Sequence, residues 1–553
     1  MGQHHEGYHQ VKLKIGLLVD NNKVEAWFYK AVERLVACDY AEVTLIINNT
    51  NPYHDNNTGH FIYNKLRALD NKLFQQKPDA QIQQEISPLF PSASKMDVTP
   101  IQSTYHDSLA AKDIKHIKAH SLDVLIRSGF RILKGNILHA AKYGVWSYHF
   151  GDHQYSRGMA DSGFWESIDN RPQTGITLQV LDENLDGGKA LYRSWSLTQQ
   201  ISPKKNIIFL KWLASPFLAR TLKRLHTLGE EKFFEEVEKK HGKLDYHDSK
   251  LYTRPSNTQA LIPFAKYLYK FTKRLIMKRF FDEEWFVMYN LDPSTADSMP
   301  DFKRIVSPLG ILWADPFVVA HDTGYYIFVE EMSYKENVGH LAVLEMDKQG
   351  NITKNTTILN TGSHLSYPNI FQEDGDWWMI PESGASRKIS LYKAKKFPYE
   401  WEFEKHLMED VKSADTTLLY HDNKWWMFTN IDEDEGSLLY NELFLFYADD
   451  FRTSNWTPHP LNPIVSDVKS SRPAGKIFVK DGKIIRPAQN SSHRYGYALS
   501  FNEIITLNQT DYEEREVRAI LPTWDKKIGG THTFNQAGDL SVIDAWGLRS
   551  KFL

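Results

Sequence analysis

A repeated pattern after residue 285 restricts the folds that this sequence can adopt. Each repeat has a small, polar or proline residue, an apolar strand, an Asp/Gly turn and a second aromatic or apolar strand. Four clear copies begin near residues 314, 366, 414 and 472: "ADPFVVAHDTGYYIFVEE", "SYPNIFQEDGDWWMIPES", "ADTTLLYHDNKWWMFTN" and "RPAGKIFVKDGKIIRPAQN". A weaker fifth copy, "GTHTFNQAGDLSVIDAW", follows. Repeats at a period of about 50 residues indicate a β-propeller, and we expect an all-β five-bladed propeller over residues 285–553.

Residues 1–200 have a different pattern. "KLKIGLLVD" at 12–20 and "AEVTLIINN" at 41–49 are compact apolar strands, and residues 22–38 between them have helical spacing. Further segments, "SLDVLIRSGF", "ILKGNILHAAKYG" and "VWSYHFGD", continue the alternation. We therefore expect an α/β domain with a mostly parallel, Rossmann-like sheet. The Gly-rich fingerprint of nicotinamide dinucleotide binding is absent after the first strand.

Residues 201–284 separate the two regions and are expected to form a helical connector. The stretch 261–280 carries six basic and no acidic residues, with apolar residues at helical spacing. One interpretation is a basic amphipathic helix that contacts an anionic membrane surface. The alternative is a connector that packs its apolar stripe on a neighbouring domain and keeps its lysines in solvent.

Composition limits the function only loosely. The net charge of −3 gives no global reason to expect a nucleic-acid partner. Aromatic residues make up 13%, which is typical of sugar-binding surfaces but also of β-sheet cores. The single cysteine, Cys38, lies in an apolar context that predicts a buried, unreactive thiol. Because the sequence has no apolar signal region and no long apolar run, we expect a cytoplasmic location, with the inner face of the membrane as an alternative.

Polar motifs follow one another in a fixed order over residues 122–195. "GVWSYHFGDHQYSRG" is followed by "TGITLQVLDENLDGGKAL". These motifs resemble the N-terminal domain of the formyltransferase family, which includes methionyl-tRNA formyltransferase and the sugar-nucleotide N-formyltransferases. His149 matches the family histidine, Asp186 the family aspartate, and Ser147 stands where the family has asparagine. The other positions that the resemblance assigns to substrate binding are Arg157, Gly158, Thr174, Gly175, Asp152 and His153, the last two in a loop that differs from the family's.

The resemblance implies transfer of a formyl group from N10-formyltetrahydrofolate to an amine. Such a reaction needs a base, a carboxylate that orients it, and a donor for the tetrahedral oxyanion. His149 and Asp186 would supply the first two, and Ser147 or a backbone amide the third. The alternative is a domain of the same fold that has lost or changed this chemistry, because the shorter serine side chain would reach the oxyanion only through a water molecule.

In a propeller, equivalent positions of successive innermost strands converge on the central axis. Here these positions are polar, which packing alone does not require. They are Asp315, the stretch Tyr367, Pro368 and Asn369, then Asp415, Arg472 and His532, and Glu382 ends the second strand of its repeat near the same mouth. A structural role is the alternative, because Asp-Pro and Asp-Thr-Thr also form stable turns.

This half of the chain resembles five-bladed propellers of the glycoside hydrolase 43 kind. The "LWADPFVV" and "SYPNIF…WWMIPES" motifs resemble still more closely the propeller domain of plant glucosamine inositolphosphorylceramide transferases. The hydrolase resemblance implies Asp315 as base, Glu382 as acid and Asp415 as modulator of the acid. Glycan binding without hydrolysis, and a pure scaffold, are the alternatives.

The two halves together favour a formyltransferase-like enzyme that acts on an amino sugar, as a nucleotide sugar or within a glycan. Its place would be surface polysaccharide or glycolipid biosynthesis, with the propeller binding the glycan. N10-formyltetrahydrofolate is the expected cofactor, and no metal ion or nucleic acid is expected. The second hypothesis is a glycan hydrolase or glycan-binding protein that works through the propeller, with a degenerate formyltransferase-like domain.

Overall fold

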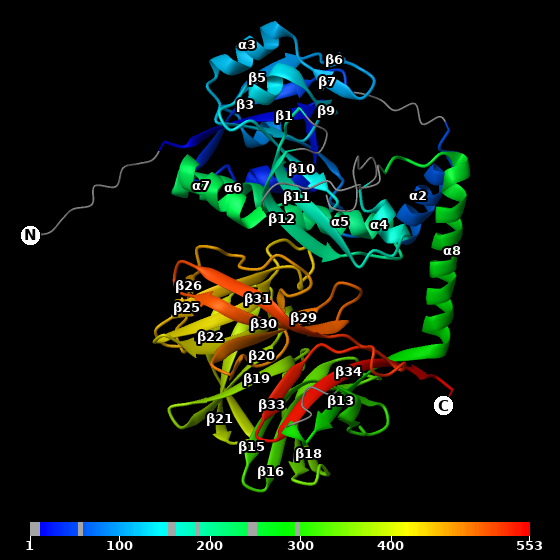
Figure 1. Ribbon diagram of the computed structural model, residues 1–553, viewed down its shortest axis with the longest axis vertical. Coiled ribbons are helices and arrows are strands. Elements are labelled where there is room, and N and C mark those ends of the chain that lie inside the picture. Colours follow the sequence, from blue (N-terminus) through cyan, green and yellow to red (C-terminus); the bar gives the residue numbers. More distant parts are fainter. Residues whose placement is uncertain are drawn as a thin grey trace, which may run out of the picture. The chain divides into compact units, whose positions relative to one another are not determined.

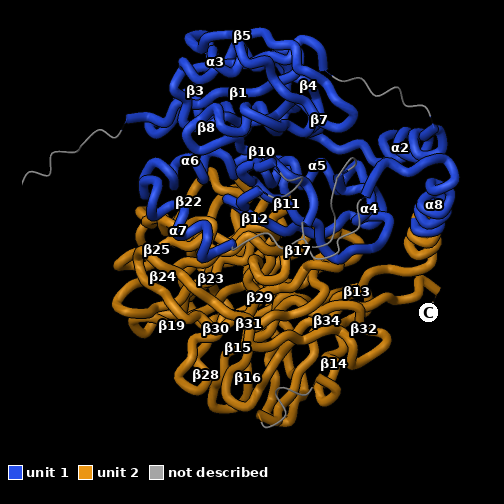
Figure 2. The backbone as a smooth tube through the Cα atoms, turned by 45° about the horizontal axis from the view of Figure 1, so that its top comes forward, with its two compact units in different colours: residues 1–270, 434–437 blue, residues 271–433, 438–553 orange. Residues whose placement is uncertain are grey.

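The chain forms two compact units. The structure, a computed structural model, describes residues 11–52, 59–152, 162–183, 188–241, 252–293 and 299–552. Unit 1 comprises Met1–Lys270 and Asp434–Ser437, and unit 2 comprises Phe271–Glu433 and Leu438–Leu553 (Figure 2). Residues of the connector predicted at 201–284 are therefore divided between the units at residue 270.

Unit 1 contains a mixed sheet around a parallel centre (Figure 1). The strand order is β12 (Lys189–Leu197), β11 (Gln173–Val180), β10 (Val145–Phe150), β8 (Val124–Arg127), β1 (Leu13–Asp20), β2 (Lys23–Glu25) and β4 (Gln83–Glu85). A side branch pairs β3 (Ala41–Asn49) with β1 and β5 (Ser94–Val98) with β3. The pairs among β10, β8, β1, β3 and β5 are parallel, whereas β11 and β12 add antiparallel strands at one edge. The prediction of a mixed α/β region is confirmed.

The helices of unit 1 differ in part from those expected. They are α1 (Ala26–Glu33), α2 (Phe61–Leu73), α3 (Ala111–Ala119), α4 (Phe164–Ile168), α5 (Pro203–Ala214), α6 (Phe217–Leu228) and α7 (Glu230–His241). The helical segment expected at 22–38 begins with β2, because those residues pair with β4. Cys38 consequently lies beyond the end of α1 and is only partly buried. A small separate sheet contains β6 (Ile101–Gln102), β7 (His106–Ser108) and β9 (Ile132–Leu133).

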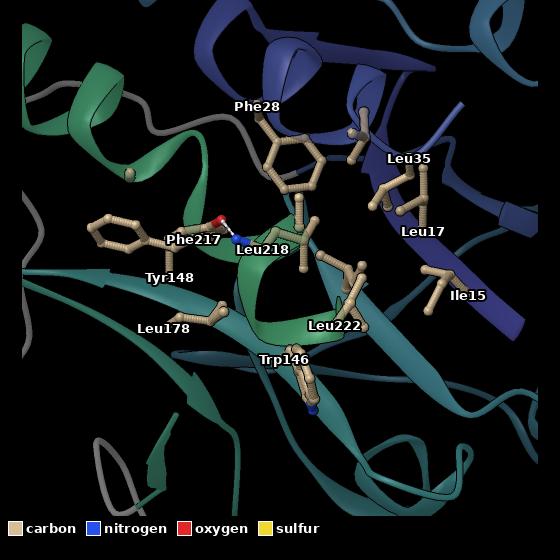
Figure 3. Packing of buried hydrophobic residues seen from close by; sticks show 14 of the residues in the cluster. Ile15, Leu17, Phe28, Leu35, Trp146, Tyr148, Leu178, Phe217, Leu218 and Leu222 are labelled. Carbon is tan, nitrogen blue, oxygen red and sulfur yellow. Dashed lines mark hydrogen bonds between the residues drawn. The ribbon is translucent and has the colours of Figure 1, made fainter. Parts of the chain in front are cut away.

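Strand alternation decides which side chains of the sheet enter the main core of unit 1. Trp146 and Tyr148 of β10 pack with Ile15 and Leu17 of β1 against residues of α1 and α6 (Figure 3). The Tyr148 hydroxyl accepts the backbone N–H of Leu218 at 3.1 Å, which fixes the start of α6 to the sheet. Because side chains alternate along a strand, Ser147 and His149 belong to the opposite face of β10.

Unit 2 is rich in strands, and its described residues form five small antiparallel sheets. Sheet 1 contains β15 (Ile311–His321), β16 (Gly324–Ser333), β17 (Gly339–Asp347) and β18 (Ile352–Leu359), and sheet 2 contains β19 (Ser366–Glu373), β20 (Asp376–Glu382), β21 (Lys388–Lys396) and β22 (Glu400–Glu409). Sheet 3 contains β23 (Ser413–His421), β24 (Lys424–Ile431), β25 (Leu443–Ala448) and β26 (Thr457–Pro458). Sheet 4 contains β27 (Arg472–Pro473), β28 (Phe478–Lys480), β29 (Lys483–Asn490), β30 (Ala498–Leu507) and β31 (Tyr512–Ile520).

Sheet 5 joins the two ends of unit 2. It combines β13 (Phe281–Asn290) and β14 (Lys303–Arg304) with β32 (Ile528–Gly530), β33 (Phe534–Ala537) and β34 (Leu540–Ser550). Strands β13 and β34 pair over their whole lengths, from Phe281 with Ser550 to Asn290 with Ser541. The first and last long strands of the unit therefore hold each other in one sheet.

Five apolar clusters lie between successive sheets of unit 2. One cluster joins sheets 5 and 1, and others join sheets 1 and 2, 2 and 3, 3 and 4, and 4 and 5. Each sheet thus contributes apolar side chains to two cores, one on each face. Burial on both faces explains why the strands of the repeats have nearly continuous apolar and aromatic runs.

Helix α8 (Asn257–Phe280) lies where the chain passes from unit 1 to unit 2. It is the long green helix of Figure 1. Among the described residues, no helix combines the length and the apolar character that a bilayer crossing requires.

Candidate functional site

A bulge recurs at the start of the first strand in sheets 1, 2 and 3. The pairing register skips two residues between Ala314 and Phe317, between Ser366 and Asn369, and between Ala414 and Thr417. The first residue of each bulge is left-handed: φ is 49° at Asp315, 43° at Tyr367 and 51° at Asp415. Non-glycine residues rarely adopt this conformation, and bulges redirect side chains next to functional sites. The repeated bulge therefore sets the direction of three side chains.

These redirected side chains join different sheets of unit 2. Asp315 Oδ1 accepts the hydroxyl of Thr533 at 2.8 Å, and its Oδ2 accepts the backbone N–H of Tyr367 at 3.2 Å. The Tyr367 hydroxyl accepts the N–H of Gly475 at 2.7 Å and lies 2.9 Å from Thr417 Oγ1. Residues of sheets 1, 2, 3 and 4 and of the loop before β33 consequently meet in one buried polar centre, as the sequence pattern predicted for Asp315.

Asp544 of β34 organises the sheet 5 side of this centre. Its Oδ1 accepts the backbone N–H groups of His532 at 2.8 Å and Thr533 at 3.0 Å, and its Oδ2 accepts that of Asp315 at 3.2 Å. The His532 ring lies between two carboxylates, with Nδ1 2.5 Å from Asp544 Oδ2 and Nε2 3.7 Å from Asp315 Oδ1. Burial disfavours the charged ring, but the two carboxylates outweigh it and raise the pKa of His532 to about 9.

Arg472 occupies the other side of the polar centre. Its Nε donates to Asp415 Oδ2 at 2.5 Å, and its Nη2 donates to Glu382 Oε2 at 3.1 Å. Gln489 also donates to Asp415 Oδ2, at 2.8 Å. One guanidinium therefore contacts two carboxyl groups, and all of these side chains are largely removed from solvent.

The carboxyl groups of the centre differ in their tendency to hold a proton. Burial, and then the neighbouring Asp415, raise the pKa of Glu382 well above its usual range. Burial raises the pKa of Asp315 to about 6, with His532 opposing part of the change. Burial and then Asp315 raise the pKa of Glu330 to about 8. Burial and neighbouring carboxylates thus favour a proton on Glu382, whereas the nearby His532 opposes part of the same change at Asp315.

Aromatic rings lie at the partly exposed edge of the centre. The ring of Tyr495 is 5.0 Å from the guanidinium of Arg472, and Trp285 stacks on His532 with centroids 4.1 Å apart. Both rings are only partly buried. Gly496 permits the approach of Trp285, since a Cβ there would lie 2.6 Å from the indole. Flat rings beside charged and amide groups form a surface that suits a sugar ring.

Asp315, His532 and Asp544 also lie close enough together to hold a metal ion. Their donor atoms are already engaged. Both oxygens of Asp544 accept backbone N–H groups, and the ring of His532 favours the protonated form, which has no free lone pair. A metal ion at this trio would therefore have to displace the proton of His532 and compete with the backbone N–H groups bound to Asp544.

Tyr367 and Asn369, both in the stretch expected at the centre, have different contacts. The side chain of Asn369 donates to the carbonyl of Thr416 at 3.1 Å, so it links sheets 2 and 3. The bulge places Tyr367 at the position that corresponds to Asp315 and Asp415. The sequence did not indicate which residue of the stretch takes this position, because a bulge changes the alternation on which the alignment of repeats depends.

Unit 1 has a cleft of about 570 Å³ near the ends of β1, β8 and β10. Ser147 lies at this cleft, and its Oγ accepts Arg127 Nε at 3.0 Å. The charged side chains that line the cleft are Asp20, Lys23, Glu25, Arg67, Arg127 and Lys211. Lys211 pairs with Glu25 at 2.6 Å, and the remaining charges leave the cleft with a cationic excess.

His149 is buried and does not belong to the described lining of that cleft. Burial, and then the positive charge of Arg127, lower the pKa of His149 to about 4. The imidazole is therefore neutral near pH 7 and only weakly basic. On the neighbouring strand, Thr177 lies opposite His149 in the antiparallel pair.

The other residues predicted for this site are only partly brought together. Asp152 accepts the indole N–H of Trp195 at 2.9 Å and lies 3.6 Å from Arg193, so it is held in a structural network. Gly175 packs against Asp152, since a Cβ at Gly175 would lie 3.0 Å from the Asp152 Cα. Thr174 bonds to Thr198 and Asn206. Asp186, Arg157, Gly158 and His153 lie outside the described residues.

Several residues of these sites were not predicted. Asp544 holds the centre of unit 2, and Arg127 and Lys211 line the cleft of unit 1. Glu166 is a further buried carboxyl group, and burial raises its pKa to about 7.

Comparison with known proteins assigns similarity mainly to unit 2. Residues 306–541 match the family described as glucosamine inositolphosphorylceramide transferase 1, N-terminal. The protein named glucosamine inositolphosphorylceramide transferase 1 of Oryza sativa subsp. japonica is 31% identical over 204 residues, 36% of this chain and 27% of that protein. Its Arabidopsis thaliana namesake is 29% identical over 207 residues, 37% of this chain and 27% of that protein. The chain thus spans about a quarter of the length of these relatives.

The resemblance to solved structures is distant. The catalytic domain of a Coprinopsis cinerea GH62 α-L-arabinofuranosidase has 12% identity and a TM-score of 0.32, covering 42% of this chain and 90% of that one. A formyltetrahydrofolate deformylase from Pseudomonas syringae pv. tomato has 14% identity and a TM-score of 0.27, covering 39% of this chain and 62% of that one.

Proposed function

We propose that unit 2 is a five-bladed β-propeller that acts on the sugar part of a glycolipid. Five sheets that share five apolar clusters in cyclic order support the propeller. The pairing of β13 with β34 supports closure of the ring within one blade. In this arrangement the first strands converge, which accounts for the meeting of Asp315, Asp415 and Arg472.

The proposed substrate class is a sugar linked to an inositol-phosphate lipid headgroup. The similarity of residues 306–541 to proteins named glucosamine inositolphosphorylceramide transferases supports this choice. The aromatic rings of Trp285 and Tyr495 at the edge of a polar centre support sugar binding on physical grounds. Glycolipid synthesis is therefore the process in which we place the chain.

The contact of one guanidinium, that of Arg472, with both Glu382 and Asp415 is the observation that carries the chemical part of the proposal. A single cation, Arg472, faces both Glu382 and Asp415, so a proton on Glu382 relieves their repulsion. The Glu382 side chain is 14% exposed, more than that of Asp315, Asp415 or Asp544. In a glycosyl transfer, such a carboxylic acid can protonate the oxygen that leaves the anomeric carbon, while the hydroxyl of the acceptor bonds to that carbon and gives up its proton to a carboxylate such as Asp315.

The test combines binding and turnover. The full chain and its Glu382→Gln variant are incubated with inositol-phosphate lipids and a nucleotide-activated amino sugar, and products and binding are measured by mass spectrometry and calorimetry. The amide retains the shape of the protonated acid. We therefore expect the variant to bind sugar with an affinity within about threefold of that of the wild type but to lose turnover by a factor on the order of 10² or more. Turnover that survives in Glu382→Gln would exclude the acid role, and absence of sugar binding by the wild type would exclude the substrate class.

One-carbon transfer in unit 1 is a second candidate, favoured by the cleft at Ser147. The described residues do not complete a folate-dependent site. The hydroxyl of Ser147 already accepts a hydrogen bond from Arg127, and His149 is not among the described residues that line the cleft. We therefore derive no chemical step that uses N10-formyltetrahydrofolate. This cofactor, and an amino sugar as the acceptor of the formyl group, stay proposals. Formylated product that is formed by the wild type and lost in His149→Gln would support this candidate, whereas no product from the wild type would remove it.

The cytoplasm, including the inner face of the membrane, is the proposed location. A substrate with a lipid anchor supports a position next to a membrane. Fractionation of cells that express the chain tests it, because recovery outside the cytoplasm and its membrane face would contradict the proposal.

A further inference from the structure

Helix α8 carries an exposed apolar stripe along its length. Its large apolar side chains recur in adjacent pairs every seven residues and are between 40% and 68% exposed: Leu261 with Ile262, Leu268 with Tyr269, and Leu275 with Ile276. Seven residues are nearly two helical turns, so the three pairs lie on one side of the helix. Phe280, which is 45% exposed, extends the stripe at the C-terminal end.

The stripe is not the face by which the helix packs on unit 1. A different set, Ala260, Pro263 and Tyr267, is buried, and Tyr267 donates to Asp70 Oδ1 at 3.2 Å. Lys266 pairs with Asp169 at 2.9 Å, and Lys270 donates to the carbonyl of Ile168 at 3.2 Å. The helix therefore has a packing face already, and the exposed stripe is a second apolar face.

The charge of α8 is of one sign. Residues 257–280 contain six basic residues and no acidic residue. Lys273, Arg274, Lys278 and Arg279 are exposed and form no ion pair with a described residue. Arg279 continues the seven-residue row of Ala265 and Thr272, so one cation lies within the stripe itself.

We infer that this face of α8 docks on the surface of an anionic lipid bilayer. Apolar side chains would enter the boundary between headgroups and acyl chains, while Lys273 beside the stripe and Arg279 within it extend to the headgroup phosphates. A second copy of the chain is a poorer occupant, because pairing two such helices would bring like charges together without a compensating carboxylate. The inference does not depend on the proposed function, since it needs only this helix.

Co-sedimentation of the full chain with lipid vesicles tests the inference. Vesicles of phosphatidylcholine alone are compared with vesicles that also contain phosphatidylserine, at low and high salt. We expect binding to the anionic vesicles that falls as salt rises, because the headgroup attraction is screened. Binding to both kinds of vesicle alike, or to neither, would overturn the inference.

Variants separate the stripe from the rest of the surface. Leu268→Gln with Leu275→Gln should weaken binding on the order of tenfold or more. Ile101 and Val479 are exposed apolar residues elsewhere, so Ile101→Gln with Val479→Gln is the matched control and should bind as the wild type does. Equal loss in both double variants would contradict a role for α8.

A double variant of basic residues and a measurement of the oligomeric state complete the test. Lys273→Gln with Arg279→Gln should reduce binding to anionic vesicles, whereas the control Lys348→Gln with Lys526→Gln, at exposed positions elsewhere, should not. Circular dichroism confirms that each variant is folded. Sedimentation velocity addresses the other occupant: a wild-type dimer that becomes a monomer in Leu268→Gln with Leu275→Gln would overturn the inference in favour of a second copy.

Discussion

His149 of unit 1 and His532 of unit 2 are both buried, yet their charge states differ. His149 has the positive charge of Arg127 nearby, and its pKa is lowered to about 4. His532 lies between Asp544 and Asp315, and its pKa is raised to about 9. Burial acts in the same direction on both rings, so the neighbours decide the outcome. The comparison shows that a histidine motif by itself does not determine whether the ring is a base or a cation.

The neighbours differ because the two units position side chains in different ways. In unit 1, Ser147 and His149 follow the regular alternation of β10, and Arg127 comes from the adjacent strand. In unit 2, left-handed bulge residues from several sheets direct carboxyl groups to one place. Repetition therefore concentrates acidic groups in unit 2, and cations must accompany them.

The largest expected effect comes from removing the anion that holds His532. Asp544→Ala removes an ion-pair partner and the acceptor of three backbone N–H groups in a fully buried site. Breaking a buried pair in this way costs about 3–5 kcal/mol, which we expect as the loss in the free energy of unfolding of unit 2. Urea unfolding followed by hydrogen exchange of β34 peptides measures it.

The matched control is an exposed pair in the same unit. Lys395 and Glu402 lie 2.8 Å apart with both side chains largely in water. Glu402→Gln should change stability by less than about 1 kcal/mol. A loss in Asp544→Ala no larger than this would show that Asp544 does not hold the centre together.

The second prediction is that the two units lose stability in opposite pH ranges. The folded pKa of His532 is above the value of 6.5 for a free imidazole, so its stabilisation is complete below pH 6.5 and is lost as pH rises to about 9. The folded pKa of His149 is below 6.5, so its contribution is complete above pH 6.5 and is lost as pH falls to about 4. Each shift corresponds to about 3 kcal/mol.

Hydrogen exchange across pH reads the two units separately. Peptides of β34 should lose protection as pH rises through the upper range, and peptides of β10 as it falls through the lower one. His532→Gln and His149→Gln should each flatten the dependence of their own unit and leave the other unchanged. Both units losing protection in the same range would show that these histidines do not control the pH dependence.

A third prediction compares two buried tyrosines. The hydroxyl of Tyr367 accepts the N–H of Gly475, and that of Tyr148 accepts the N–H of Leu218. Tyr→Phe leaves a buried N–H without an acceptor, which costs about 1–3 kcal/mol. Tyr367→Phe should have the larger effect, because its hydroxyl also contacts Thr417 and the Gly475 carbonyl. Denaturant unfolding measures both variants, and an equal or reversed order would contradict the importance of the extra contacts.

The repeats and the apolar strands were sufficient to predict the class of each half. The five segments predicted from 285 onwards correspond to strands of the five sheets of unit 2. The helix expected at 22–38 was wrong at its start, because β2 pairs with β4, which lies about 60 residues later in the chain. Such a long-range pairing leaves no signal in the local spacing of apolar residues.

The candidate site could be predicted where the internal repeats place equivalent residues at one centre. Asp315, Asp415, Arg472 and His532 could be found because equivalent repeat positions converge, and Glu382 because it ends the neighbouring strand. Asp544 could not be found, since it lies in the last strand of sheet 5 and acts mainly through backbone N–H groups. In unit 1, Arg127 meets Ser147 because β8 and β10 are adjacent parallel strands. The sequence does not show which residues of two such strands lie opposite each other.

The smallest expected effect is at Ser147, and it sharpens the contrast between the units. Ser147→Ala removes the acceptor of Arg127 Nε, but Arg127 lines an open cleft where water can replace the hydroxyl. We therefore expect a loss of at most about 1 kcal/mol in the free energy of unfolding of unit 1, measured in denaturant. A loss above about 2 kcal/mol would mean that Ser147 anchors a buried network of the kind found in unit 2. A small loss would instead indicate that the guanidinium of Arg127 is held mainly by the carbonyl of Arg131, to which its Nη1 donates at 2.7 Å.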